Sequence, residues 1–159
     1  MIESIRVDDR LIHGQVALVW SKEYGVTHIV VANDAASVND VQQMTLKMAT
    51  PSGIKLLIKN VADAIGVFNH PKAQETKMFV LTNTITDALR IVEACDTVKS
   101  VNVANVGRFD RSENKVTLNS CLLVNPEEMN SLRKLAEKDI PVFHQVIPSA
   151  AKVSVSKLI

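Results

Sequence analysis

The chain has few of the residues on which several classes of protein depend. It contains one Trp, one Tyr, four Phe and two Cys among 159 residues, and its formal net charge is only +1. Proteins that bind nucleic acids usually carry clustered basic residues and aromatic platforms for base stacking, so no nucleic acid partner is expected. Cys95 and Cys121 form neither a CxxC pair nor a disulfide framework, which indicates two ordinary thiols in a reducing compartment.

Long hydrophobic runs are also missing. No stretch approaches the roughly eighteen consecutive apolar residues of a transmembrane helix, and the chain opens on a strand-like run that carries Glu3 and Arg6 rather than on a signal peptide. We therefore expect a cytoplasmic protein. Its length and its 47% content of hydrophobic residues suit one continuous core, so residues 1–159 are predicted to form a single domain.

Apolar, β-rich runs alternate with segments of helical period along the whole chain. This alternation predicts an α/β fold with a mainly parallel central sheet of about six to seven strands and helices on both faces. Two further short runs, 115–118 and 121–124, predict a hairpin or an edge strand late in the chain. The expected sheet strands are Ile2–Val7, His28–Ala32, Lys55–Ile58, Met78–Leu81, Ser100–Val103 and Val142–Val146.

Helical segments are recognised by apolar residues at intervals of three and four and by capping residues at their starts. Three such sets each predict one buried helix face, and an amide or hydroxyl three residues before a carboxylate marks a helix start. The predicted faces are Val16, Val19, Trp20 and Tyr24, then Val41, Met44 and Met48, then Val61, Ile65 and Phe68; the predicted starts are Asn60, Thr84 and Asn125, the last followed by Pro126.

One segment, residues 6–16, has a composition that packing alone does not explain. It places two arginines, two aspartates and a histidine between the first strand and a helix. If residues 6–10 are extended, Asp8 lies between Arg6 and Arg10 on one side of the chain and can hold both guanidinium groups. These groups would then point toward His13.

His13 has the surroundings that a phosphate-carrying histidine needs. A neutral imidazole is a competent nucleophile, and Arg10 offers a bidentate donor for phosphoryl oxygens. Gly14 and Gln15 open the next helix, so their backbone N–H groups and the helix dipole favour an anion at this point. The alternative is a local cap or a solvated salt-bridge network, which these residue types also form.

Other candidates lie outside this segment. Asp34 follows the second strand and either reaches the ligand crevice or starts the second helix, and Arg108 follows the fifth strand as a surface residue or a phosphate contact. A metal site built from Asp8, Asp9 and His13 matches no zinc or calcium spacing, so no metal and no cofactor is expected. His28 and His144 fall inside strands, where structural roles are expected, and His70 before Pro71 is expected in a loop.

The string Arg6-Val-Asp-Asp-Arg-Leu-Ile-His-Gly-Gln-Val-Ala17 closely resembles the active-site segment of the IIB components of the mannose/fructose/sorbose family of sugar phosphotransferase systems, which includes an N-acetylgalactosamine type. The resemblance continues through Trp20, 31–34, 50–53, 69–71 and 100–103, and so covers most of the chain. One departure is the loop after the fifth strand, where family members commonly carry a glycine pair and this chain has only Gly107.

The resemblance implies that a phosphorylated IIA component transfers its phosphoryl group to Nδ1 of His13, which passes it to a sugar bound by the membrane components IIC and IID. Arg10 and Arg6 would contact the phosphoryl oxygens and Asp8 would orient these arginines. Asp9 would either hold His13 or cap the helix. The protein would then be cytoplasmic but peripherally associated with the membrane components, and it would need no cofactor.

Two other classes of protein use similar residues. A histidine phosphatase or phosphomutase uses an Arg-His-Gly motif, but here two residues separate Arg10 from His13. A signalling receiver module needs an aspartate ending the third strand and a lysine ending the fifth, whereas this chain offers Lys59-Asn60 and Ala104-Asn105. A homo-oligomer is also open, since apolar residues near Val153 and Leu158 could contact a second chain.

Overall fold

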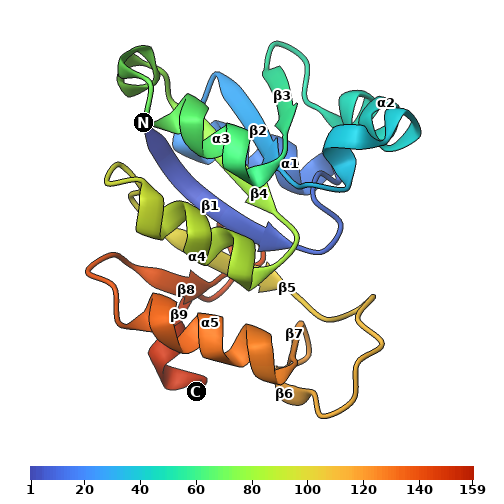
Figure 1. Ribbon diagram of the computed structural model, residues 1–159, viewed down its shortest axis with the longest axis vertical. Helices are drawn as coiled ribbons and strands as arrows, with labels where there is room; N and C mark the ends of the chain where they lie inside the picture. Colours follow the sequence, from blue (N-terminus) through green and yellow to red (C-terminus); the bar gives the residue numbers. More distant parts are fainter.

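A computed structural model describes all residues from Met1 to Ile159. Strands and helices alternate as the sequence predicts, and a two-stranded hairpin interrupts the alternation late in the chain (Figure 1). The strands are β1 Ile2–Asp8, β2 His28–Ala32, β3 Lys55–Lys59, β4 Met78–Thr82, β5 Val101–Asn105, β6 Val116–Asn119, β7 Leu122–Val124, β8 Val142–His144 and β9 Val153–Ser154. The helices are α1 Gly14–Tyr24, α2 Asp40–Ala49, α3 Val61–Phe68, α4 Ile85–Ala94 and α5 Pro126–Ala136, with 3₁₀ turns η1 Ala36–Val38, η2 Pro71–Glu75 and η3 Val155–Lys157.

The central sheet has seven strands in the order β3-β2-β4-β1-β5-β8-β9. All neighbouring pairs are parallel except β8 with β9, which is antiparallel. The expected mainly parallel sheet is thereby confirmed, as is the separate hairpin of β6 and β7. β1 lies in the middle of the sheet, between β4 and β5, so the segment that follows it emerges at the centre of the carboxyl edge.

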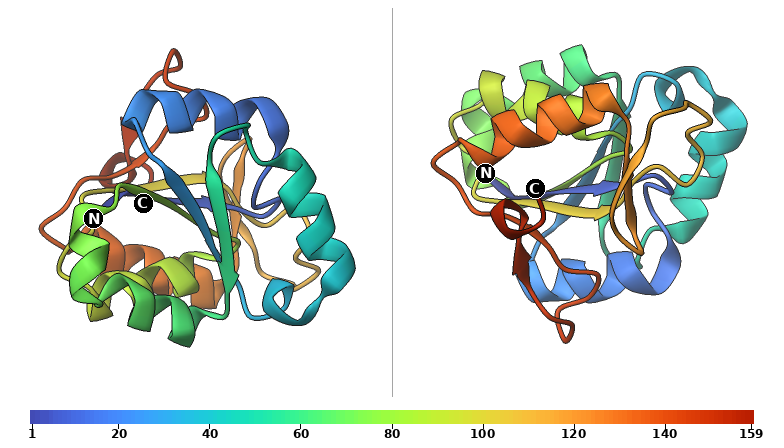
Figure 2. Two further views of the ribbon diagram at one scale, coloured as in Figure 1. Left: turned by 90° about the horizontal axis from the view of Figure 1, so that it is seen from above. Right: turned by 90° about the horizontal axis from the view of Figure 1, so that it is seen from below.

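Helices cover both faces of this sheet, as Figure 2 shows. α1 and α2 lie on one face over a smaller core that includes Trp20, Leu46 and Phe79. The helices α3, α4 and α5 lie on the other face over the larger core, to which Phe68 and Leu132 belong. Both faces of the inner strands are therefore buried, which explains why β2 and β4 are almost continuously apolar. β1 and β5 differ, because each also buries polar side chains, among them Asp8 and Asn105.

Four of the five α-helices begin with a side-chain cap. Asn60, Thr84 and Asn125 accept hydrogen bonds from backbone N–H groups of α3, α4 and α5, which confirms these three predicted helix starts. Asn39 does the same for α2. Each of these helices also has an acidic residue in its first turn. α1 has neither feature: His13 is its N-cap residue, and no side chain caps it.

The predicted buried face of the second helix is wrong. Val41, Met44 and Met48 are 76%, 65% and 83% exposed, and Leu46 is the buried residue of α2. The amide Nε2 of Gln43 donates to the carbonyl of Ala36, which turns the polar side of α2 inward. α2 lies over the β3 edge of the sheet and buries only a narrow stripe, so most of its apolar residues remain in solvent.

The apolar residues near the C-terminus are not free for a second chain in the way the sequence suggested. Val153 pairs with His144 across the β8–β9 ladder, and Leu158 packs against the larger core. Both side chains are half-buried within the chain itself. No helix of the fold has the length and hydropathy that a membrane crossing requires.

Candidate functional site

Asp8 is the buried centre of the site. Its side chain has no exposed surface, and it lies at the end of β1. Its carboxylate accepts three hydrogen bonds, from Arg6 Nη2 at 3.2 Å, from the backbone N–H of Arg10 at 3.0 Å and from Asn105 Nδ2 at 3.1 Å. A carboxylate held in this way is fixed in position and can in turn fix a neighbouring group.

His13 is that neighbouring group. Its Nε2 lies 3.5 Å from Asp8 Oδ2, which is an ion-pair distance rather than a short hydrogen bond. Nε2 is itself buried, although the side chain is 30% exposed, so the exposed surface belongs to the rest of the side chain. Burial lowers the pKa of His13 most strongly, Asp8 opposes this, and Arg10 and Arg6 lower it further. The imidazole is therefore neutral near pH 7, and a proton on Nε2 directed at Asp8 leaves Nδ1 with its lone pair.

The two arginines occupy different positions around the Asp8 carboxylate that His13 also faces. Arg6 is buried beneath Asp8, and its Nη1 donates to the carbonyl of Val146 at 3.1 Å. Arg10 is 38% exposed, and its Nε is 3.9 Å from Asp8 Oδ1. Arg10 thus keeps its donors available at the surface, whereas most of those of Arg6 are occupied inside the protein.

The start of α1 completes the site. Gly14 and Gln15 are the first two residues of this helix, both are exposed, and no side chain caps their N–H groups. A β-carbon added at Gly14 would meet no atom of the chain within 4 Å. Free backbone donors at a helix start, next to open space, form an arrangement that binds anions.

Leu11 determines how this short loop turns. It adopts the left-handed conformation, with φ of 58°, and its N–H donates to the carbonyl of Asp8. Such a φ is unfavourable for a leucine, yet its side chain is buried in the smaller core beside Ile12 and Trp20. Burial of Leu11 therefore compensates the backbone cost and fixes the turn between Asp8 and His13.

Asp9 makes neither of the two contacts expected of it. Its Oδ2 accepts from the backbone N–H of Arg108 at 3.0 Å, so it joins the β1 end to the loop after β5 instead of holding His13 or capping α1. Burial raises the pKa of Asp9. The Arg108 side chain is exposed and forms no ion pair, so this residue enters the site through its backbone.

Asp34 has a structural contact that the sequence did not indicate. Its Oδ1 accepts from the backbone N–H of Val61 at 2.9 Å, which links the loop after β2 to the first turn of α3. The second helix is capped by Asn39 instead. Asp34 therefore does not start the second helix.

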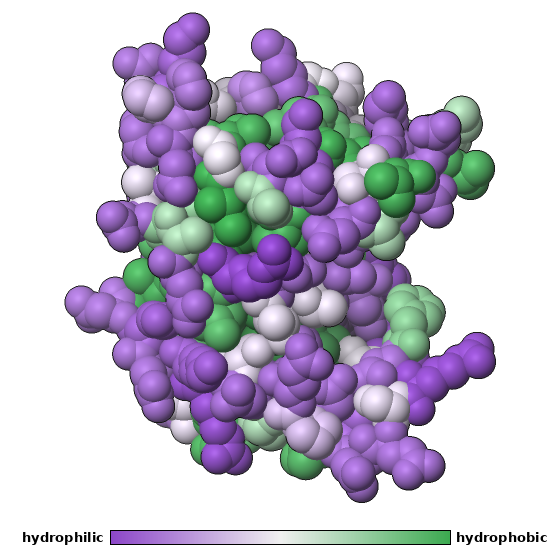
Figure 3. Space-filling model, viewed as in Figure 1, coloured by the Kyte–Doolittle hydropathy of each residue, from purple (hydrophilic) through white to green (hydrophobic).

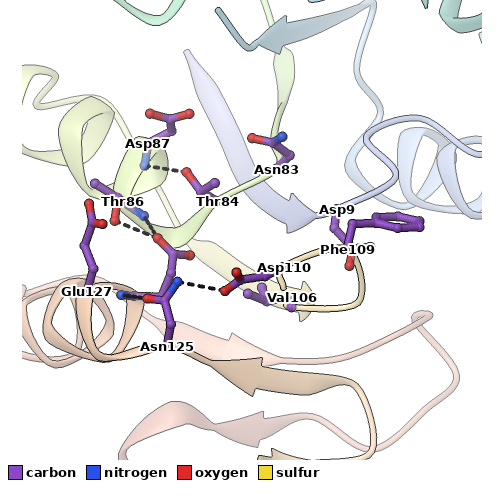
Figure 4. A pocket seen from close by; sticks show the side chains of 12 residues that line it. Asp9, Asn83, Thr84, Thr86, Asp87, Val106, Phe109, Asp110, Asn125 and Glu127 are labelled. Atoms are coloured by element: carbon purple, nitrogen blue, oxygen red, sulfur yellow. Dashed lines mark hydrogen bonds between the residues drawn. The ribbon is translucent and has the colours of Figure 1, made fainter. Parts of the chain in front are cut away.

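A polar crevice of 530 Å³ adjoins Asp9 on the α4 and α5 side of the carboxyl edge (Figure 4). Its lining includes five carboxyl residues and no basic one, so it repels rather than binds phosphate. Figure 4 shows Phe109 beside Asp9 at one end, and Phe109 is 67% exposed. The carboxyl residues are Asp9, Asp87, Asp110, Glu127 and Glu128.

Sequence analysis missed two residues that support the site. The sequence does not single out Asn105, although a polar residue ending a buried strand beside β1 is a signal that could identify a partner for Asp8. Trp20 was read as core alone, but its Nε1 donates to the carbonyl of Val146 at 3.0 Å, the same carbonyl that Arg6 contacts. No sequence pattern connects residue 146 with either of them.

The remaining histidines all have local contacts within the chain, and His70 lies in the loop between α3 and η2, as expected. His144 Nδ1 lies 2.8 Å from the carbonyl of Val103, and His70 Nδ1 accepts from the backbone N–H of Lys72 at the start of η2. His28 Nδ1 is 2.7 Å from Thr27 Oγ1. No hydrogen bond or ion pair joins any of the three to Asp8 or Arg10.

Fold and site together define an α/β protein with a neutral, arginine-flanked histidine at the carboxyl edge of a parallel sheet, which is a composition suited to phosphoryl transfer. The sequence model of one protein family, described as the sorbose subfamily IIB component of the phosphotransferase system, matches residues 2–159. A probable phosphotransferase enzyme IIB component of Streptococcus pyogenes is 51% identical over 162 residues, which cover 100% of this chain and 99% of that protein.

Two further relatives extend this result. The mannose-specific EIIAB component of Escherichia coli is 32% identical over 154 residues, covering 97% of this chain but only 47% of that longer protein. The crystal structure of the IIB domain of the sorbose permease from Klebsiella pneumoniae superposes with a TM-score of 0.90 at 26% identity, covering 99% and 95% of the two chains. The chain belongs to the sorbose subfamily of phosphotransferase-system IIB components, and it acts as a phosphoryl relay in sugar uptake.

Proposed function

We propose that His13 is the phosphoryl carrier of this IIB component and that Nδ1 is the nitrogen that carries the group. The donor is the phosphorylated IIA component, and the acceptor is a sugar held by the membrane components IIC and IID. The names of the relatives, which include mannose-specific, sorbose-specific and N-acetylgalactosamine-specific components, support a hexose or an N-acetylated amino sugar as the acceptor. The protein then works in the cytoplasm, at the inner side of the transporter.

Two displacements at phosphorus make up the reaction. The lone pair of His13 Nδ1 attacks the phosphorus of the donor, and the bond between phosphorus and the donor group breaks. A hydroxyl oxygen of the sugar then attacks the same phosphorus, the P–N bond breaks, and the hydroxyl proton is released. Both steps need little beyond alignment and charge stabilisation, so no cofactor takes part.

The arrangement around His13 supports a distinct role for each neighbour. Arg10 and the N–H groups of Gly14 and Gln15 contact the phosphoryl oxygens, because their donors are exposed and uncapped. Asp8 holds the proton on Nε2 and so keeps Nδ1 nucleophilic. Arg6 fixes Asp8 from below and makes no phosphate contact. Asp9 positions the Arg108 loop, and Asp34 has no part in transfer.

One observation carries the proposal: the only α-helix without a side-chain cap is the one whose N-cap residue is a histidine with its Nε2 facing a buried carboxylate. A relay site must also release its phosphoryl group. A half-exposed histidine with surface donors binds the group less tightly than a closed pocket would, which favours onward transfer. This also suits short-lived contacts with two successive protein partners.

Reconstitution with the phosphorylated cognate IIA component tests the proposal. Intact mass should rise by one phosphate, the added mass should map to a peptide containing His13, and the linkage should be labile in acid but stable in base. His13→Ala should abolish the uptake while His70→Ala, which removes another surface histidine, should retain it. Retained labelling in His13→Ala, or an acid-stable linkage, would contradict the assignment.

A further inference from the structure

A second, apolar groove lies away from His13, on the opposite face of the sheet from α1. It runs between α3 and the edge formed by β2 and β3, and its volume is 570 Å³. This size is within the range of about 300–1,000 Å³ that small-molecule sites occupy. Figure 3 shows hydrophobic surface gathered over the same elements. The apolar lining comes from Val30, Leu57, Ala62, Val67, Ala73 and Met78.

The rim of this groove is basic. Lys59, Lys72, His28 and His70 line it, against a single acidic residue, Asp63. The Asp63 carboxylate is already engaged, since Asn60 Nδ2 donates to it at 3.0 Å. Neither lysine side chain forms a hydrogen bond or an ion pair within the chain. Each histidine uses Nδ1 for a local contact, which leaves its Nε2 available.

We propose that this groove binds a small amphiphilic anion, namely a molecule with an apolar chain or ring and one carboxylate or phosphate group. The apolar floor excludes a sugar phosphate, which would bury its hydroxyl groups without partners. The basic rim favours an anionic head group over a neutral or cationic one. The site is independent of the proposed phosphoryl transfer, because no residue around His13 lines the groove.

Gly66 makes the proposal testable without damage to the fold. It lies within α3 and lines the groove, and a β-carbon built on it meets no atom within 4 Å. A leucine at this position would fill the groove from the helix side. Because glycine is an unfavourable residue inside a helix, replacing it should maintain or raise the stability of α3. Loss of binding in such a variant therefore cannot be attributed to unfolding.

Octyl phosphate, used below its micelle concentration, is the probe for calorimetry and for NMR of the full chain. We expect saturable binding, shifts of the His28 and His70 imidazole signals, and at least about a tenfold weaker affinity in Gly66→Leu. Gly66→Ala, the matched control for helix propensity, should bind nearly as wild type does. Lys59→Gln combined with Lys72→Gln should also weaken binding about tenfold, whereas Lys134→Gln on α5 should have no effect.

Two comparisons decide the chemistry of the ligand. Octanol and octyltrimethylammonium should bind at least about tenfold more weakly than octyl phosphate if the basic rim selects an anion. Equal binding of all three, or unchanged binding in Gly66→Leu, would overturn the proposal. Vesicles of phosphatidylglycerol show whether the ligand is a membrane lipid or a soluble metabolite. If the protein binds these vesicles and Gly66→Leu abolishes that binding, the ligand is a lipid head group. If the protein binds octyl phosphate but not the vesicles, the ligand is a soluble metabolite.

Discussion

Gly107 lies so close to the backbone of Leu123 that a β-carbon on it would stand 1.9 Å from the carbonyl oxygen of Leu123. Its φ of 93° is also one that other residues rarely adopt. The loop after β5 therefore depends on this one glycine to lie against β7, and the same loop presents the N–H of Arg108 to Asp9.

Gly107→Ala should displace this loop and lower the free energy of unfolding by about 2 kcal/mol or more, because both the contact and the backbone conformation become unfavourable. Chemical denaturation measures the loss. Gly53→Ala is a useful comparison, since Gly53 also has a positive φ but no atom within 4 Å of its added β-carbon. Equal losses in the two variants would show that the approach to Leu123 is unimportant.

Removal of the negative charge at the centre of the site should be costly. In Asp8→Asn the buried Arg6 guanidinium loses its carboxylate partner, and an uncompensated buried charge costs about 3–5 kcal/mol of stability. The pKa of His13 should fall further, because Asp8 is the group that raises it. Denaturation and NMR titration measure the two effects. Asp139→Asn, at an exposed position, should show neither; an unchanged pKa of His13 in Asp8→Asn would mean that the two side chains are not coupled.

Arg10→Lys tests the guanidinium group at the surface. A lysine keeps the charge but not the bidentate geometry, so both transfer steps should slow by about tenfold or more while the fold remains stable. Rapid-quench measurement of phosphoryl uptake and release gives the rates. Arg133→Lys on α5 serves as the control. Unchanged rates in Arg10→Lys would assign Arg10 to the structure of the loop rather than to the phosphoryl group.

The titration of His13 predicts how stability varies with pH. Burial holds its pKa in the folded protein below the ordinary value of 6.5, so the folded state takes up this proton less readily than the unfolded state. The contribution of His13 to stability is therefore constant above pH 6.5. It declines as the pH falls from 6.5 toward the lower pKa that His13 has in the folded protein. The unfolding free energy of the wild type minus that of His13→Gln should therefore decrease as the pH is lowered from 7.5 to 5.5. A difference that grows on acidification would mean that the pKa of His13 is raised instead.

Leu11 offers an unusual order of stabilities. Leu11→Ala loses the buried side chain and keeps the left-handed backbone of a residue with a β-carbon, whereas Leu11→Gly loses the side chain but relieves the backbone. The glycine variant should therefore be more stable than the alanine variant by about 1 kcal/mol, and both should be less stable than the wild type. Thermal denaturation of the three proteins decides the order. If Leu11→Ala were instead more stable than Leu11→Gly, the loop would have relaxed to a negative φ at this residue.

Much of the fold was predictable because local signals and burial agreed. β2 and β4 are buried on both faces and so appear as nearly continuous apolar runs, and the helix starts at Asn60, Thr84 and Asn125 carry their own capping residues. α2 was misread because its apolar residues have helical spacing on the solvent side as well. The spacing of apolar residues identifies an apolar face of a helix. Which face is buried depends on how the helix packs against the β3 edge of the sheet.

The site was predictable where its residues are contiguous and not where they meet across the sheet. The segment that contains Asp8, Arg10 and His13 was recognised from composition alone. The inward orientation of Arg6 depends on the carbonyl of Val146, and the contact of Asp9 depends on the N–H of Arg108. Such partners are set by strand order and not by spacing, so a single sequence does not reveal them.

The strand order also governs when this site can exist during synthesis. β1 precedes β4 and β5 along the chain, yet these two strands are its neighbours in the sheet, so Arg6 finds Leu81 on one side and Asn102 on the other only after both later strands have been translated. Contacts between segments this far apart form late and slowly. During synthesis the segment around Asp8 therefore lacks its neighbouring strands until β4 and β5 have been made. An activity assay detects only chains in which the whole sheet has formed.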